Sequence, residues 1–158
     1  MSYEKVKNYF ESINMGDRIT VHTTPCDTVE HAAQNIGCDE AQIAKTMSFL
    51  LDDDAIVIVC AGDVKVKNNK YKETFSKKAK MIPFEDVEKI TGHKPGGVCP
   101  FALNENVKVY LDVSLKRFET VYAAAGDLNA TAEIKVDEFE SITNCTGWVD
   151  VCDLTEQQ

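Results

Sequence analysis

The sequence lacks any long hydrophobic run, and its longest unbroken apolar stretch is the seven residues from Ala55 to Ala61. A membrane-spanning helix needs about 20 such residues, so no transmembrane segment is predicted. The N-terminal residues contain no apolar core of a secretory signal, which favours a cytoplasmic protein. Basic residues are scarce, because 17 Lys and Arg stand against 26 Asp and Glu, for a net charge of −9. That balance argues against a duplex DNA binder and against strong attraction to membranes.

Metal-binding signatures are also missing. The six cysteines form no C-x-x-C pair and show no ligand-like spacing with the three histidines. In a chain without a secretory signal we interpret these cysteines as reduced thiols. No zinc site is therefore expected.

The composition is that of an ordinary globular protein, with 44% apolar and 27% charged residues among 158. One domain over residues 1–158 is predicted, with an N-terminal helix at about 3–14. Strands and short helices alternate irregularly, which favours a mixed α/β fold with a curved sheet. The further predicted helices are 28–36, 39–44, 68–75, 84–90 and 137–142, and the strands are 19–24, 46–51, 55–60, 81–82, 107–111, 120–125, 132–136 and 147–151.

Five of the twelve glycines and prolines lie between Gly92 and Pro100. The spacing of Gly92 and Gly97 matches the two glycines of a P-loop, but Val98 and Cys99 stand where that loop needs a lysine and a hydroxyl. A stiff, glycine-containing loop can turn several backbone N–H groups toward a developing oxyanion. The alternative is an ordinary turn between a helix and a strand.

Lys45 lies where a short predicted helix meets an apolar strand. A lysine entering a core strand is costly unless its ammonium finds an anion. It can otherwise extend its stem along the surface and keep the charge in water. Both interpretations remain open on the sequence alone.

Seven lysines and one acid, Glu73, fall between Lys65 and Lys80, so an otherwise acidic chain carries one basic segment. Such a segment can attract the phosphates of an RNA. A solvated helix face is the simpler interpretation. The candidate phosphate contacts are Lys70, Lys72, Lys77 and Lys78.

Five segments, taken in order and with their spacing, resemble the YbaK family. They are Ile43-Ala44-Lys45-Thr46, Cys60-Ala61-Gly62-Asp63, Thr91 to Phe101, Asp112-Val113-Ser114-Leu115 and Tyr122 to Gly126. That family contains free-standing aminoacyl-tRNA deacylases and the editing domain associated with bacterial prolyl-tRNA synthetase. The resemblance spans about residues 21–151.

The resemblance implies a mixed, barrel-like α/β fold and hydrolysis of the ester of a mischarged tRNA. Lys45 would project into the cleft, face the 96–100 loop and position the substrate, and backbone amides of that loop would hold the oxyanion. The implied loop residues are Gly96, Gly97, Val98, Cys99 and Pro100. The implied substrate contacts are Thr24, Thr46, His93, Asp112, Ala124 and Thr131. The implied partners are the tRNA acceptor end and an aminoacyl-tRNA synthetase, and no metal or organic cofactor is implied.

Two alternatives follow from the chain's own residues. Thr24, Ala124 and Thr131 stand where cysteine-specific family members carry other groups, so cysteinyl-tRNA is in doubt as substrate. These departures favour a non-catalytic module that binds aminoacyl-tRNA or a synthetase. The second alternative makes Cys99 a thiol nucleophile with His93 as its base, which requires the two side chains to meet.

Overall fold

The computed structural model describes residues 2–154. The predicted domain of residues 1–158 is described over this range, and Met1 and residues 155–158 lie outside it. The helices are α1 (Ser2–Ser12), α2 (Val29–Ile36), α3 (Asn68–Phe75), α4 (Val87–Thr91) and α5 (Phe139–Thr143). The strands are β1 (Ile19–Val21), β2 (Ile43–Leu51), β3 (Asp54–Ala61), β4 (Val64–Val66), β5 (Val107–Asp112), β6 (Thr120–Ala124), β7 (Ala130–Lys135), β8 (Gly147–Val149) and β9 (Cys152–Leu154). Short 3-10 turns join several of them.

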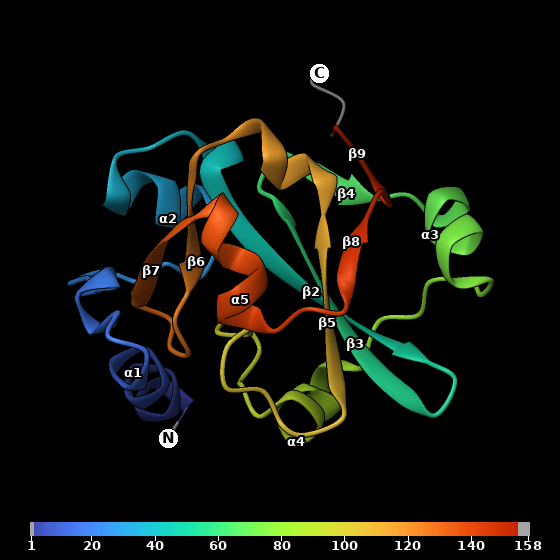
Figure 1. The fold of residues 1–158 in the computed structure, drawn as a ribbon, viewed down its shortest axis with the longest axis horizontal. Coiled ribbons are helices and arrows are strands. Elements are labelled where there is room, and N and C mark those ends of the chain that lie inside the picture. Colours follow the sequence, from blue (N-terminus) through green and yellow to red (C-terminus); the bar gives the residue numbers. More distant parts are fainter. Residues whose placement is uncertain (1, 155–158) are drawn as a thin grey trace.

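A seven-stranded mixed sheet runs in the order β1-β7-β6-β2-β3-β5-β8, and β4 pairs with β9 in a separate two-stranded ribbon. The pairs β2/β3, β6/β7 and β1/β7 are antiparallel, whereas β2/β6, β3/β5 and β5/β8 are parallel. Figure 1 shows the strands strongly twisted, with short helices around them. The predicted mixed α/β class is confirmed. Within residues 2–154 the sheet does not close into a barrel, because β1 and β8 remain its edges.

The core lies between the sheet and α1, α3 and α5. Seven consecutive residues of β3 are buried, in keeping with its apolar sequence. Phe10 of α1 packs edge-on against Phe101, with 4.8 Å between ring centroids, and Phe101 stacks in turn on Phe139 of α5. Thus α1 is part of the main core, and it covers the loop that follows α4.

Local signals place several element ends correctly. The hydroxyl of Thr28 accepts a hydrogen bond from the His31 N–H at the start of α2, and Gly37 ends that helix with φ = 85°. A left-handed residue at this position is the usual role of glycine.

Other boundaries differ from the sequence prediction for identifiable reasons. The predicted helix 39–44 is only a 3-10 turn over Glu40–Gln42, and β2 begins at Ile43, so Lys45 lies inside a strand. The predicted strand 81–82 is a single bridge between Phe49 and Met81. The last predicted strand ends at Val149, because the Val151 N–H bonds the Asp112 carboxylate instead of a neighbouring strand.

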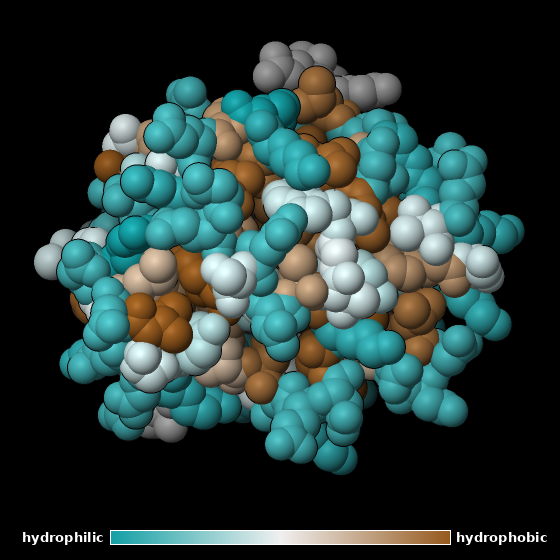
Figure 2. All heavy atoms as spheres, viewed as in Figure 1, coloured by the Kyte–Doolittle hydropathy of each residue, from teal (hydrophilic) through white to brown (hydrophobic). Residues whose placement is uncertain are grey.

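Within residues 2–154, no helix is long and apolar enough to cross a membrane. The face drawn in Figure 2 is mostly hydrophilic, with hydrophobic residues in scattered patches.

Candidate functional site

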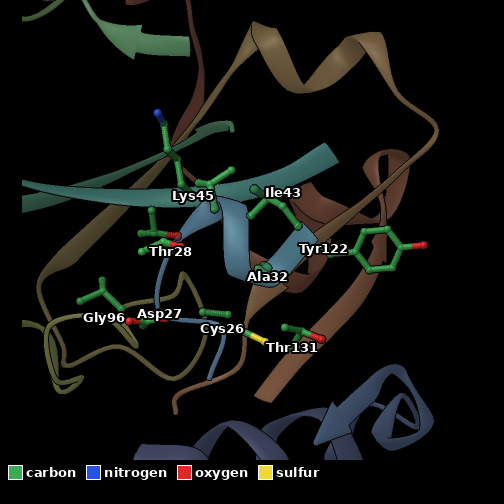
Figure 3. Close-up of a pocket in the computed structure, with 15 residues that line it drawn as sticks. Cys26, Asp27, Thr28, Ala32, Ile43, Lys45, Gly96, Tyr122 and Thr131 are labelled. Carbon is green, nitrogen blue, oxygen red and sulfur yellow. The ribbon is translucent and has the colours of Figure 1, made fainter. Parts of the chain in front are cut away.

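A pocket with a cavity of about 210 Å³ lies between α2, β2, β6, β7 and the loop after α4. We call this site the pocket throughout. Binding sites of drug-sized ligands usually measure about 300–1,000 Å³, so this one suits a group of amino-acid size. Its lining residues are Cys26, Asp27, Thr28, Val29, Ala32, Ile43, Ala44, Lys45, Thr46, Gly96, Val98, Tyr122, Ala123, Ala124 and Thr131. Figure 3 shows how they surround the space.

The sheet itself opens the pocket. The parallel pair β2/β6 is in register only at Ile43–Tyr122 and Ala44–Ala123, so the two strands part just before Lys45. Small side chains at Ala123 and Ala124 of β6 leave room where they separate. The N-terminal end of α2 closes one side of the gap through Thr28 and Ala32.

Lys45 lines the pocket from β2 and is half-buried. Its ammonium points away from Gly96 in Figure 3, so the expectation that it faces the loop is wrong. Arg117 donates hydrogen bonds to Asp63 at 3.0 and 2.5 Å. These bonds are the main cause of the lowered pKa of the Asp63 carboxyl, and the nearby charge of Lys45 lowers it further. Lys45 is therefore within electrostatic reach of Asp63, an acid that does not line the pocket.

The loop after α4 contributes Gly96 and Val98 to the pocket, whereas the predicted residues Gly97, Cys99 and Pro100 are buried and do not line it. Gly96 has φ = 90°. The N–H of Gly97 donates to the Lys94 carbonyl at 2.9 Å, so this amide is not available to a substrate. Within the described residues, the N–H of Val98 makes no hydrogen bond. The N–H of Gly96, which also lines the pocket, makes none either among these residues, so both amides are candidate donors to a ligand oxygen.

Cys99 and His93 do meet, but in the core. Both side chains are fully buried, with the Cys99 sulfur 3.5 Å from His93 Nε2. His93 Nε2 lies 2.7 Å from the Phe101 carbonyl, which can only accept, so Nε2 carries the proton and Nδ1 accepts from the Ser2 hydroxyl. His93 thus cannot take a proton from the thiol through Nε2. Burial raises the pKa of Cys99 to about 12 and lowers the pKa of His93.

The nucleophile hypothesis fails on these contacts, because a buried thiol with a raised pKa has neither the charge nor the access it needs. The prediction that His93 contacts the substrate is also wrong. Its ring joins the loop to α1.

Asp112 is another predicted substrate contact that the structure places elsewhere. Its carboxylate is 1% exposed and accepts hydrogen bonds from the N–H groups of Ser114 and Val151, both at 2.9 Å. It lies outside the pocket and links the end of β5 to the chain before β9. Asp112 is a structural cap, so its assignment to the substrate is corrected.

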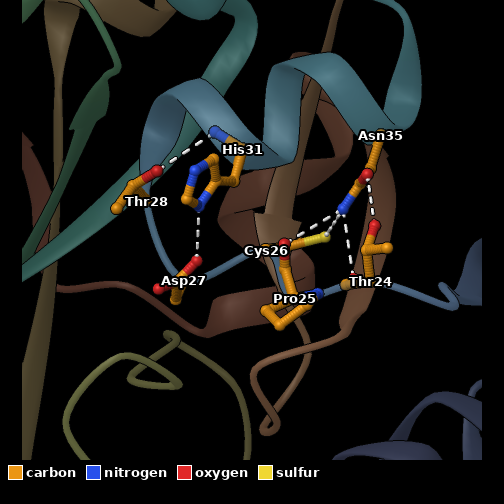
Figure 4. Close-up of polar contacts among 7 residues, drawn as sticks. All are labelled: Thr24, Pro25, Cys26, Asp27, Thr28, His31 and Asn35. Carbon is orange, nitrogen blue, oxygen red and sulfur yellow. Dashed lines mark hydrogen bonds and ion pairs between the residues drawn. The ribbon is translucent and has the colours of Figure 1, made fainter.

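Thr24 likewise lies outside the pocket, and its hydroxyl donates to Asn35 Oδ1 at 2.6 Å (Figure 4). The Asn35 amide group donates in return to the carbonyls of Thr24 and Pro25, both at 3.1 Å, and to the Cys26 sulfur at 3.2 Å. Asn35 of α2 therefore holds the segment that carries Cys26 into the pocket wall. Sequence reasoning missed Asn35, since a lone polar residue on a short helix gives no periodic signal.

Asp27 and His31 form a second polar contact at the pocket rim (Figure 4). His31 Nδ1 lies 2.7 Å from an Asp27 carboxylate oxygen. This hydrogen bond raises the pKa of His31 and lowers the pKa of Asp27. Both side chains are well exposed, so the pair adds little to stability.

The pocket brings together other residues that were predicted from distant parts of the sequence. Thr46 of β2, Ala124 of β6 and Thr131 of β7 line it, as do Lys45 and two residues of the glycine loop. Further lining residues were not predicted from the sequence as site residues, among them Cys26, Asp27, Thr28 and Tyr122. Only Thr28 had a local signal, as a helix cap.

The lysine-rich segment is partly neutralised. Lys70 forms ion pairs with Asp150 at 3.1 Å and Asp153 at 2.8 Å, and Lys77 pairs with Asp52 at 3.4 Å. No ion pair is found for Lys72 or Lys78 among residues 2–154. Of the four predicted phosphate contacts, these two keep their charges available.

Comparison with known proteins places the chain among editing domains. The family model described as "Aminoacyl-tRNA editing domain" matches residues 23–142. The uncharacterized protein YwhH of Bacillus subtilis (strain 168) is 43% identical over 153 residues, which cover 96% of this chain and 98% of YwhH. A proline–tRNA ligase of Caldicellulosiruptor bescii is 29% identical over 133 residues, which cover 80% of this chain and 23% of the ligase.

Among solved structures, one of a candidate trans-editing enzyme for prolyl-tRNA synthetase superimposes with a TM-score of 0.86. The identity is 24%, and the match covers 96% of this chain and 97% of the other. At that identity the likeness concerns the fold.

Proposed function

Because the chain belongs to the aminoacyl-tRNA editing domain family, we propose that it acts in trans as an aminoacyl-tRNA deacylase, which hydrolyses the ester of a mischarged tRNA. The observation that carries this proposal is the pocket, which combines a small cavity, a lysine and an unpaired loop amide. A cavity of amino-acid size suits the aminoacyl group. The relatives named proline–tRNA ligase make the tRNA for proline the first RNA to test. The cytoplasm, where tRNAs are charged, is the proposed location.

The chemistry asks little of the protein, because an aminoacyl ester is already activated. A water molecule attacks the carbonyl carbon and gives up a proton, and the negative charge moves to the carbonyl oxygen. The Val98 N–H would stabilise that oxyanion. The bond to the ribose oxygen then breaks, and this oxygen takes up a proton. One oxyanion donor is commonly worth about 100-fold or more in kcat.

Lys45 would act on the RNA side of the ester. Its stem lines the pocket while its ammonium lies toward the rim, where the terminal ribose and phosphate would arrive. Lys72 and Lys78 are the proposed further phosphate contacts, since Lys70 and Lys77 are held by acids.

The proposal predicts that the purified chain deacylates at least one member of a panel of tRNAs charged with small amino acids. The measurement is release of labelled amino acid, with a no-protein reaction as the baseline. Correctly charged prolyl-tRNA serves as the control for selectivity. Tight binding of charged tRNA without release of amino acid would replace the deacylase with a non-catalytic binding module.

Replacing Cys99 with serine is expected to leave most of the deacylation rate intact, because the sulfur is buried and faces His93 and the Phe101 carbonyl. Steady-state kinetics of the Cys99→Ser variant test this. A near-complete loss of activity, together with an acyl-thioester trapped on the wild-type chain, would restore the nucleophile mechanism. Urea denaturation of both proteins controls for a change in stability.

A further inference from the structure

Thr131 supplies a polar group to the pocket although its side chain is almost entirely buried. It is 5% exposed, lies in β7 and lines the cavity. Its hydroxyl oxygen is 2.8 Å from Nε2 of His22, the residue that follows β1. Figure 3 draws Thr131 at the same end of the pocket as the Cys26 sulfur and away from Lys45. This end is where a side chain of the bound amino acid would reach.

The backbone, rather than the imidazole, fixes the position of His22. The His22 N–H donates to the Asn129 carbonyl at 2.7 Å, and the Asn129 side-chain amide donates to the His22 carbonyl at 3.1 Å. These backbone contacts place the imidazole ring beside Thr131, and a substitution of the His22 side chain leaves them in place. The contact of the ring with Thr131 can therefore be removed without moving the backbone.

The contact leaves hydrogen-bonding capacity facing the cavity. A hydroxyl has one proton and two lone pairs. If Nε2 donates to Thr131, the hydroxyl proton is free to donate into the pocket. If Thr131 donates to Nε2, its lone pairs remain free to accept. The neighbouring walls are apolar, with Ala32, Ile43 and Ala123 among the lining residues.

A hydroxyl on the bound amino acid satisfies Thr131 in either state, since it can both donate and accept. A methyl group in the same place leaves the remaining hydrogen-bonding capacity of the Thr131 hydroxyl unmet in a site from which water is displaced. Such unmet polar groups are what allow a site to reject an isosteric apolar ligand.

We propose that Thr131 is the specificity-determining residue for the amino-acid side chain, and that His22 is the positioning residue which orients its hydroxyl toward a hydroxyl-bearing substrate. This inference rests on the proposed deacylase function, and it adds the feature by which the pocket selects among amino-acid side chains.

The test compares two minimal esters of adenosine, one of serine and one of 2-aminobutyrate, whose side chains differ by a hydroxyl in place of a methyl group. Wild type is expected to prefer the seryl ester. Thr131→Val keeps the branched shape, and it is expected to lower the seryl/aminobutyryl ratio of kcat/KM about fivefold, the worth of one neutral hydrogen bond.

Thr20→Val is the matched control. Thr20 pairs with Thr131 across β1 and β7 but is exposed and outside the pocket, so its loss should leave the ratio unchanged. His22→Leu is expected to lower the ratio as Thr131→Val does. His22→Gln, which retains an N–H donor, is expected to restore it. A purely packing role for His22 would give no such rescue.

An unchanged ratio in Thr131→Val, with both esters still hydrolysed, would overturn this inference and leave the deacylase intact. Hydrolysis of neither these esters nor any charged tRNA by wild type would overturn the proposed function. If wild type hydrolyses no substrate, calorimetric Kd values for the amide-linked analogues of the two amino acids test the role of Thr131 by binding alone. The role of Thr131 is supported if Thr131→Val removes a preference for the seryl analogue. It is contradicted if wild type has no such preference.

Discussion

Replacing Lys45 with alanine is expected to lower kcat/KM for deacylation of charged tRNA about 100-fold, since charge-assisted contacts are worth about 1.5–3 kcal/mol each. The ammonium lies at the pocket rim and the four-carbon stem forms part of the wall. Rotation about the bonds of that stem can carry the charge from the side of Asp63 toward an incoming ester or phosphate. Because Lys45 is only half-buried, the free energy of unfolding should change little.

Two variants separate charge from shape at this position. Lys45→Arg keeps the charge and should retain part of the activity, whereas Lys45→Met keeps the apolar stem and should behave like alanine. Lys108→Met is the matched control, because Lys108 is an exposed lysine of β5 outside the pocket. If Lys45→Met deacylates as fast as wild type, the lysine contributes only packing and its proposed role is wrong.

Local sequence signals were enough for much of the fold. Alternation and apolar runs identified β2, β3, β5, β6 and β7, and the helix predicted over 28–36 agrees with α2 to within one residue. These features are decided within a few residues of chain. The strands β4 and β9 were missed, since each has three residues and exists only because the other pairs with it.

The candidate site was predictable where the strands of the sheet carry it. Lys45, Thr46, Ala124 and Thr131 sit on three strands, and the pairing of β2, β6 and β7 brings them to one cavity. The resemblance to a known family supplied these positions together. Residue patterns alone gave only Lys45 and the glycine loop.

Burial was the part that sequence could not supply. His93, Cys99 and Asp112 have chemistry suited to a site, yet each is enclosed by segments distant in the chain. Ser2 of α1 reaches His93 across 91 residues, and Val151 reaches Asp112 across 39. No sequence pattern near His93 or Asp112 indicates those partners. The same holds for the contact of His22 with Thr131, which spans 109 residues.

Placing an alanine at Gly96 is expected to lower kcat/KM about 100-fold, the loss that a displacement of about 1 Å in a catalytic site can cause. Gly96 has φ = 90°, a conformation that costs an L-residue about 1–2 kcal/mol. A Cβ there would lie 2.7 Å from Cδ2 of Leu128, so the loop or Leu128 must move. The exposed Leu128 side chain can move aside, so the expected effect comes from the strained backbone: relief of that strain shifts the loop and displaces Val98, whose N–H is the proposed oxyanion donor, from its place in the pocket wall.

Gly37→Ala separates backbone strain from the effect on the pocket. Gly37 has φ = 85°, nearly that of Gly96, but an added Cβ there meets nothing within 4 Å, and the residue lies outside the pocket. Both variants should therefore lose about 1–2 kcal/mol of stability in urea denaturation, and only Gly96→Ala should lose activity. Equal kcat/KM values for the two variants would remove the 96–98 loop from the catalytic machinery. Among residues 2–154, Lys45 is the only cationic residue that lines the pocket, and without that loop it would be the group left to act on the ester.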